Sequence, residues 1–77
     1  MRQISLDELS RKFNVNISEL ENELRTLGLS LNDIRIYVLD YIPMRLQHLF
    51  FELRDLGLII VEARVVEGKL ILLCANI

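Results

Sequence analysis

Residues 23–29 read ELRTLGL and residues 52–58 read ELRDLGL, so six of seven positions match at an offset of 29. Apolar residues keep the same spacing upstream in both copies, in the pairs Leu20 and Leu49, Ile17 and Leu46, Val15 and Met44, Phe13 and Ile42, and Leu9 and Val38. Because equal spacing buries equal faces, the pattern predicts one supersecondary unit used twice. The unit has the pattern of two helices joined by a turn, which makes nucleic-acid binding the first functional hypothesis.

The composition is that of a small domain with many apolar side chains. The chain has 77 residues, of which 52% are hydrophobic, and its mean hydropathy is +0.34. A chain of this length buries only about 60–65% of its extended surface on folding. Some apolar residues must therefore stay at the surface. We expect one domain over residues 1–77 that associates with a second copy as a homodimer.

The charge balance is slightly acidic. Nine Lys and Arg residues stand against eleven Asp and Glu residues, which gives a net charge of −2. Proteins that bind duplex DNA usually carry a basic surplus, because phosphate neutralisation supplies much of their affinity. The balance therefore counts mildly against DNA, although a local basic patch can outweigh the total.

No set of residues has the spacing of a catalytic or metal site. The single cysteine, Cys74, lies in an apolar segment and excludes an internal disulfide and a multi-cysteine zinc site. We expect it to be a buried, inert thiol. His48 is the only histidine, so a metal site would need carboxylates from elsewhere. We therefore expect no enzyme activity, no catalytic residue, no bound metal and no cofactor.

The sequence shows no targeting or membrane segment. The first ten residues, MRQISLDELS, are polar and have the pattern of a helix start rather than a signal peptide. The apolar runs are far shorter than a membrane span. We therefore expect a cytoplasmic protein with no membrane partner.

Three segments share one helix-start pattern, in which a capping side chain is followed three residues later by an acid and flanked by two apolar residues. The capping residues are Ser5, Asn16 and Ser30. The predicted helices cover about 5–13, 16–28 and 30–42.

Pro43 ends the third helix and can start a fourth over 44–57. The apolar side of this fourth helix is formed by Leu46, Leu49, Phe50, Leu53 and Leu56. The alternative concerns residues 34–42, which are β-branched and aromatic and are compatible with a strand. That alternative gives two helices followed by β-α-β-β with a three-stranded sheet, and it weakens the DNA hypothesis.

After Gly57 the apolar period changes to two, which predicts a hairpin with strands over about 58–66 and 69–75 and a tight turn at Glu67 and Gly68. The pairs expected to face the helices are Val65 with Leu70, Ala63 with Leu72 and Val61 with Cys74. The pairs expected on the outer face are Arg64 with Ile71, Glu62 with Leu73 and Ile60 with Ala75. This outer face is half apolar, which a hairpin exposed to water does not need.

The first unit has the usual helix–turn–helix spacing, in the residues Leu9, Ser10, Phe13, Asn14, Val15, Leu20 and Leu24. Together with the C-terminal hairpin, this pattern resembles the winged-helix superfamily. The resemblance implies an α+β, mostly helical, winged-helix-like fold of four short helices followed by a C-terminal β-hairpin. It also implies a small DNA-binding protein of the transcription-regulator type, acting on double-stranded DNA.

The helix after Pro43 is the better candidate for recognition, because the helix after Asn16 presents three carboxylates against one guanidinium. The residues expected to read the groove are Arg45, Gln47 and His48, and those expected to contact the phosphate backbone are Arg64 and Lys69.

The second hypothesis is a winged-helix-like module for protein–protein contacts that binds no nucleic acid. Its expected interface with a protein partner or a second copy consists of Ile60, Ile71, Leu73 and Phe51. Neutral hairpin charges favour this second hypothesis, whereas the resemblance favours the first.

Overall fold

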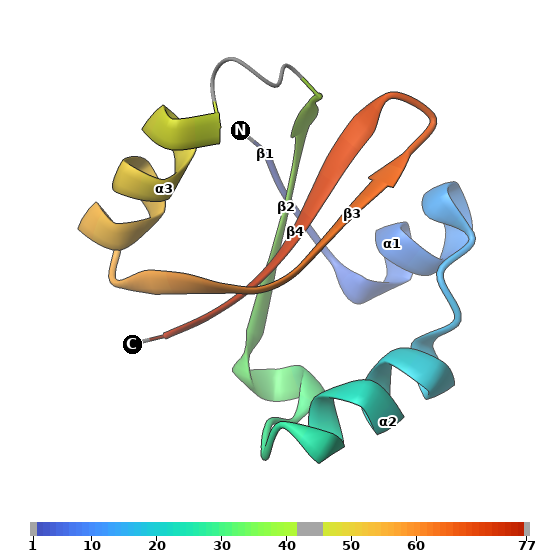
Figure 1. Cartoon of the computed structure of the whole chain (residues 1–77). Coiled ribbons are helices and arrows are strands. Elements are labelled where there is room, and N and C mark those ends of the chain that lie inside the picture. Colours follow the sequence, from blue (N-terminus) through green and yellow to red (C-terminus); the bar gives the residue numbers. More distant parts are fainter. Residues whose placement is uncertain (1, 42–45, 77) are drawn as a thin grey trace.

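The computed structural model describes residues 2–41 and 46–76 (Figure 1). Its elements in chain order are β1 (Arg2–Ile4), α1 (Leu6–Phe13), α2 (Ile17–Thr26), the 3₁₀ turn η1 (Leu31–Asp33), β2 (Ile34–Asp40), α3 (Leu46–Asp55), β3 (Leu58–Val66) and β4 (Lys69–Asn76).

The four strands form one sheet in the order β1-β2-β4-β3, and every neighbouring pair is antiparallel. The last strand, β4, lies between β2 and β3, so β2 and β3 run in the same direction with α3 connecting them. The two edges differ in length, because β1 has three residues and β3 has nine.

Helices cover both faces of the sheet, with α1 and α2 on one side and α3 on the other (Figure 1). On the α1/α2 face, the sheet residues Ile36, Val38, Ile71 and Leu73 pack with the helix residues Leu9, Leu20 and Leu24. On the α3 face, Tyr37, Leu70, Leu72 and Cys74 pack with Leu49 and Leu53. Each buried leucine contributes about 1.5–3 kcal/mol. The fold therefore has two apolar cores that share one sheet.

The first two predicted helices are confirmed. The Ser5 side chain accepts a hydrogen bond from the Glu8 amide at 3.1 Å, and the Asn16 side chain accepts one from the Glu19 amide at 3.1 Å. Each bond satisfies an amide that has no partner within its helix, which fixes where the helix begins. Asn14 ends α1 in the left-handed conformation, with φ at 54°.

The predicted helix over 30–42 is wrong. Ser30 does form a capping box with Asp33, but it caps only η1, and the chain then enters β2. This strand pairs with β4 over seven positions and buries Tyr37 on one face and Ile36 on the other. β-Branched and aromatic residues suit a central strand that is covered on both faces, so packing overrides the local cap.

The predicted fold class is therefore wrong. The described residues form three α-helices and a four-stranded antiparallel sheet, not four helices followed by a C-terminal hairpin. The β-α-β-β alternative is closer, although it lacked β1. The predicted helix over 44–57 is described from Leu46 to Asp55 as α3, and residues 44 and 45 lie outside the described part.

The predicted hairpin is confirmed, and both turn residues, Glu67 and Gly68, have the positive φ of a type I′ turn. Near the turn the register is as expected, from Val65 opposite Leu70 to Glu62 opposite Leu73. Beyond it, the expected pairs of Val61 with Cys74 and Ile60 with Ala75 are wrong. A bulge between Ile60 and Glu62 shifts the ladder and sets Ile60 opposite Cys74.

Candidate protein-interaction surface

The residues expected to bind DNA do not gather on one surface. Gln47 and His48 are exposed in the first turn of α3, whereas Arg64 lies opposite Ile71 on the α1/α2 face of the sheet. Lys69 begins β4 beside the hairpin turn. Arg45 lies outside the described residues. The sheet therefore separates Arg64 from the exposed side chains of α3.

The cations of the hairpin are held by carboxylates. Arg64 Nε donates to Glu62 at 2.8 Å, and Arg64 Nη2 donates to Glu23 of α2 at 3.0 Å. The hydrogen bond to Glu62 holds the pKa of Arg64 above its ordinary value. Lys69 Nζ donates to Asp40 and holds the pKa of that carboxyl below its ordinary value. A phosphate group would have to displace these carboxylates.

The same neutralisation extends over the surface that the structure describes. Six of the eight described Lys and Arg residues form ion pairs with Asp or Glu, and these are Arg2, Arg11, Lys12, Arg25, Arg64 and Lys69. The other two are Arg35 and Arg54. An electrostatic footprint for nucleic acid needs unpaired cations on one face, and the described surface lacks such a cluster.

The outward side of α3 carries a group of exposed apolar residues instead. Phe50 and Phe51 are each 58% exposed, whereas Leu49 and Leu53 are buried against the sheet. Leu56, the residue that follows α3, is also 58% exposed. Successive helix residues are rotated by about 100°, so the two residues after Leu49 turn away from the sheet. Phe51, which was expected at an interface and not among the residues of the apolar side, is exposed. Phe50 and Leu56 were expected to be buried, and that expectation is wrong.

A cation accompanies these aromatic rings. The Arg54 guanidinium carbon lies 5.6 Å from the centroid of the Phe51 ring, within cation–π distance. We call the set Phe50, Phe51 and Arg54 the α3 ridge. Aromatic residues and arginine are the types enriched in protein–protein interfaces, where they provide much of the binding energy.

The other residues expected at the interface, Ile60, Ile71 and Leu73, do not lie on the α3 ridge. Ile71 and Leu73 were expected on an outer hairpin face, but β4 is a central strand and α1 and α2 cover that face, so both are in the core. Ile60 is half-buried beside the α3 core. Only Phe51 of this set is exposed. The signal that could have found Phe50 is its position next to Leu49, since adjacent helix residues are rotated by about 100° and cannot both point to the centre of one core.

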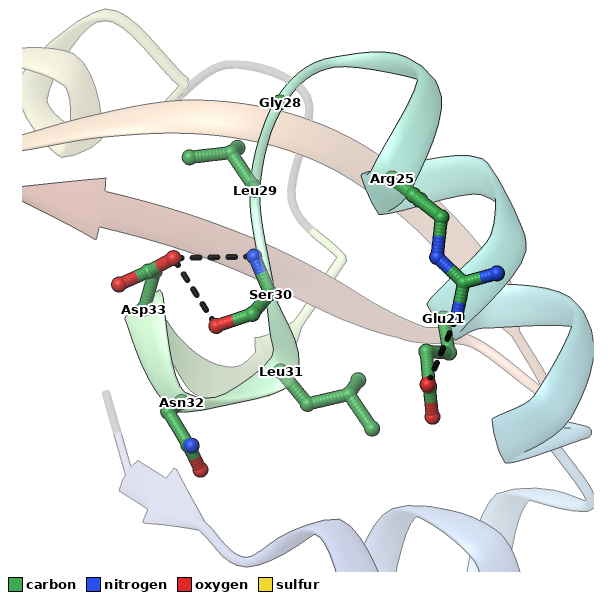
Figure 2. A pocket seen from close by; sticks show the side chains of 8 residues that line it. All are labelled: Glu21, Arg25, Gly28, Leu29, Ser30, Leu31, Asn32 and Asp33. Atoms are coloured by element: carbon green, nitrogen blue, oxygen red, sulfur yellow. Dashed lines mark hydrogen bonds and ion pairs between the residues drawn. The ribbon is translucent and has the colours of Figure 1, made fainter.

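A hollow lies where α2 ends and η1 begins (Figure 2). The residues that line it are Glu21, Arg25, Gly28, Leu29, Ser30, Leu31, Asn32 and Asp33.

Its polar groups bond to one another. Arg25 Nη2 donates to Glu21 at 3.1 Å, and the amide and hydroxyl of Ser30 donate to Asp33 Oδ2 at 2.9 and 3.0 Å (Figure 2). The Ser30 amide is the main cause of the lowered pKa of Asp33. The first contact is an i,i+4 ion pair within α2 and the second starts η1, so these four polar residues have structural partners without a ligand.

Cys74 is a buried free thiol, as predicted, and burial raises its pKa to about 11. At neutral pH it is protonated and therefore a poor nucleophile. Within residues 2–41 and 46–76, no three His, Cys, Asp or Glu side chains lie together as a metal site. None of the described helices has the length and hydropathy to cross a membrane.

Comparison with known proteins gives no match: neither a family model, nor a curated protein, nor a solved structure matches this chain.

Proposed function

We propose that this chain is a protein-interaction module and that the α3 ridge is its docking surface. The observation that carries the proposal is the pair Phe50 and Phe51, both more than half exposed on a helix whose inner side is already packed by Leu49 and Leu53. Two neighbouring phenylalanines in water contribute little to the fold. They can release a large apolar area when a partner covers them.

The partner chemistry follows from the charge on the α3 ridge. Arg54 stands over Phe51, and no carboxylate of the described residues pairs with it. We therefore propose a protein partner that presents an apolar groove bordered by a carboxylate. The groove would receive the two rings, and the carboxylate would bind the guanidinium, the group best suited to such pairing.

DNA binding stays a prediction, and the ion pairs of Arg64 and Lys69 do not favour it. A cytoplasmic location is also part of the proposal. It is supported by the single cysteine, which is free and buried, because extracellular domains of this size usually rely on disulfides.

The test compares the wild-type chain with the double variant Phe50→Ser/Phe51→Ser and with Arg54→Glu. Each is used as bait in an extract of the source cells, and proteins lost with both variants are produced in pure form and titrated by calorimetry. We expect a partner whose affinity falls at least about tenfold with either variant, a loss typical of an interface anchor. Glu19→Ser on α2 is the control, since its side chain is exposed and lies outside the α3 ridge.

A second arm titrates labelled duplex DNA with the wild-type chain at several salt concentrations. We expect no binding at low salt. The proposal would be overturned by duplex binding whose affinity falls steeply with salt and falls again with Lys69→Ala, because that result shows phosphate neutralisation. It would also be overturned by a purified partner that binds both ridge variants as tightly as the wild type.

A further inference from the structure

The exposed edge of the sheet is a second, independent feature. Among the described residues, β3 pairs only with β4, and no other strand lies along its outer side over the nine residues LIIVEARVV. At the opposite edge of the sheet, β1 is only three residues long. In Figure 1, β3 runs between the helical layer of α1 and α2 and the layer of α3. A long apolar edge of this kind is a template for another strand.

The hairpin turn determines which backbone groups point outward. The two-residue turn sets Val66 opposite Lys69, and a pair that flanks such a turn is hydrogen-bonded. Bonded and non-bonded pairs alternate from there, so Arg64 and Glu62 bond to β4. The N–H and C=O groups of Ala63 and Val65 therefore face the free edge. Both side chains are exposed, and that of Val65 is 55% exposed.

The charges on β3 complement one another about Ala63. Glu62 and Arg64 flank it on the same face of the sheet, and Arg64 Nε donates to Glu62 at 2.8 Å. If two β3 strands pair antiparallel with Ala63 opposite Ala63, Glu62 of each copy lies opposite Arg64 of the other. Every charge has an opposite charge beside it along the strand and across it.

We infer that β3 pairs with β3 of a second copy of this chain, antiparallel and centred on Ala63, to give a dimer with one continuous eight-stranded sheet. The neighbouring registers are disfavoured by charge. Centring the pair on Glu62 places two carboxylates opposite each other, and centring it on Arg64 does the same with two guanidinium groups.

The occupant is a second copy because the complementarity lies within a single strand. A two-fold axis through Ala63 brings each residue against its partner in both directions, which is the condition for a closed dimer. Pairing gives hydrogen-bond partners to the outward backbone groups of β3 in both copies. The bulge between Ile60 and Glu62 ends the regular ladder, so the short start of β3 before the bulge and the three-residue β1 edge remain outside. Growth into fibres is therefore opposed.

The sharpest test places a cysteine on the two-fold axis. In a hydrogen-bonded antiparallel pair the Cα atoms lie about 5.5 Å apart, which is within the range that a disulfide spans. We expect Ala63→Cys to form a disulfide-linked dimer under mild oxidation. Val65→Cys is the matched control, because it is exposed on the same edge but lies about 13 Å or more from its equivalent. Equal cross-linking of both variants, or of neither, would overturn the inference.

Sedimentation of the full chain tests the same interface without a new bond. We expect a species of twice the 9.0 kDa chain mass at high micromolar concentration. Ala63→Pro removes an outward N–H while keeping the bonds to β4, so it should raise the dimer dissociation constant at least about tenfold with an unchanged circular dichroism spectrum. Glu62→Arg should act in the same direction, since it sets arginine opposite Arg64.

Glu52→Arg on α3 makes the same change in net charge and should leave the dissociation constant unchanged. A wild-type chain that is monomeric at every concentration would overturn the inference. So would a dimer that survives Ala63→Pro and dissociates with Phe50→Ser/Phe51→Ser, since the α3 ridge would then be the contact. The α3 ridge and the β3 edge share no residue, so either proposal can fail alone.

Discussion

The assignment of α3 residues to core and surface predicts a large difference between two substitutions two positions apart. Leu53→Ala removes a side chain that is 1% exposed and packed in the α3 core. Truncating a buried leucine costs about 2–5 kcal/mol, and we expect about 3 kcal/mol here. Phe51→Ala removes a larger side chain that is 58% exposed, and surface substitutions usually cost within about 0.5 kcal/mol.

The cost of Leu53→Ala is large relative to the total stability of the fold. A chain of 77 residues is expected to have a free energy of unfolding of about 4–12 kcal/mol. In a domain of this size, 1 kcal/mol shifts Tm by about 4–8 °C, so Leu53→Ala should lower Tm by roughly 12–24 °C. Phe51→Ala should lower it by no more than about 4 °C.

The assay is urea and thermal unfolding followed by circular dichroism, with all chains at one low concentration so that self-association does not alter the comparison. Comparable destabilisation by the two variants would refute the reasoning. It would mean that Phe51 packs against the domain, and the α3 ridge would no longer be a free surface.

Three further outcomes are expected. Replacing Glu67 by Asn should raise the free energy of unfolding by about 0.5–1 kcal/mol in a urea titration, because Glu67 has φ at 50° and Asn-Gly suits a type I′ turn. Asp33→Asn should reduce the loss of stability in acid: the folded-state pKa of Asp33 is lowered by Ser30, so its contribution is present above the ordinary carboxyl pKa of about 4 and is lost as pH falls through the lowered value. Unfolding curves of both chains from pH 7 to pH 2 check this, and parallel curves would contradict it. Cys74 should react with a thiol reagent slowly in the folded chain and rapidly in urea, since it is buried and its pKa is raised to about 11.

Local signals in the sequence predicted the features that local physics decides. The caps at Ser5 and Asn16, the hairpin turn and the burial of Cys74 depend on residues near in the chain, and the structure confirms each. β1 could not be found in this way, because three residues acquire a strand conformation only from their partner, β2. The wrong prediction for residues 34–42 has the same cause. These residues form a strand because β4 pairs along them, and that pairing cannot be seen from the local sequence.

The candidate site was found only in part for a related reason. Phe51 was expected at an interface, but Phe50 and Leu56 were placed in the core because they are apolar and follow the helical period. Apolar identity predicts burial only where the fold supplies a surface to cover the residue. The sheet covers one side of α3, which Leu49 and Leu53 already fill. Similarly, Ile71 and Leu73 were placed outside because the second helical layer over the hairpin could not be seen from the spacing.

The repeated heptapeptide has a physical meaning other than the expected helix–turn–helix. In both copies the glycine adopts positive φ, 77° at Gly28 and 76° at Gly57, and its amide donates to an arginine carbonyl at 3.0 and 2.9 Å. The repeat therefore encodes the end of a helix and the return of the chain to the sheet. The leucines that follow the two glycines then anchor opposite cores, Leu29 on the α1/α2 face and Leu58 on the α3 face.

The match upstream of these two helices, α2 and α3, does not share a structure. Leu9 lies in α1 and its counterpart Val38 lies in β2, yet both are buried in the same core. A shared apolar position shows that two residues are buried, but it does not distinguish a helix from a strand over a short run. The pattern predicted a duplicated unit of two helices, but the structure duplicates one helix and its end, since α2 (Ile17–Thr26) and α3 (Leu46–Asp55) coincide at the offset of 29. The expected second two-helix unit is therefore a strand and a helix of a sheet that is covered on both faces. The α3 ridge and the β3 edge are the surfaces that we propose for partners.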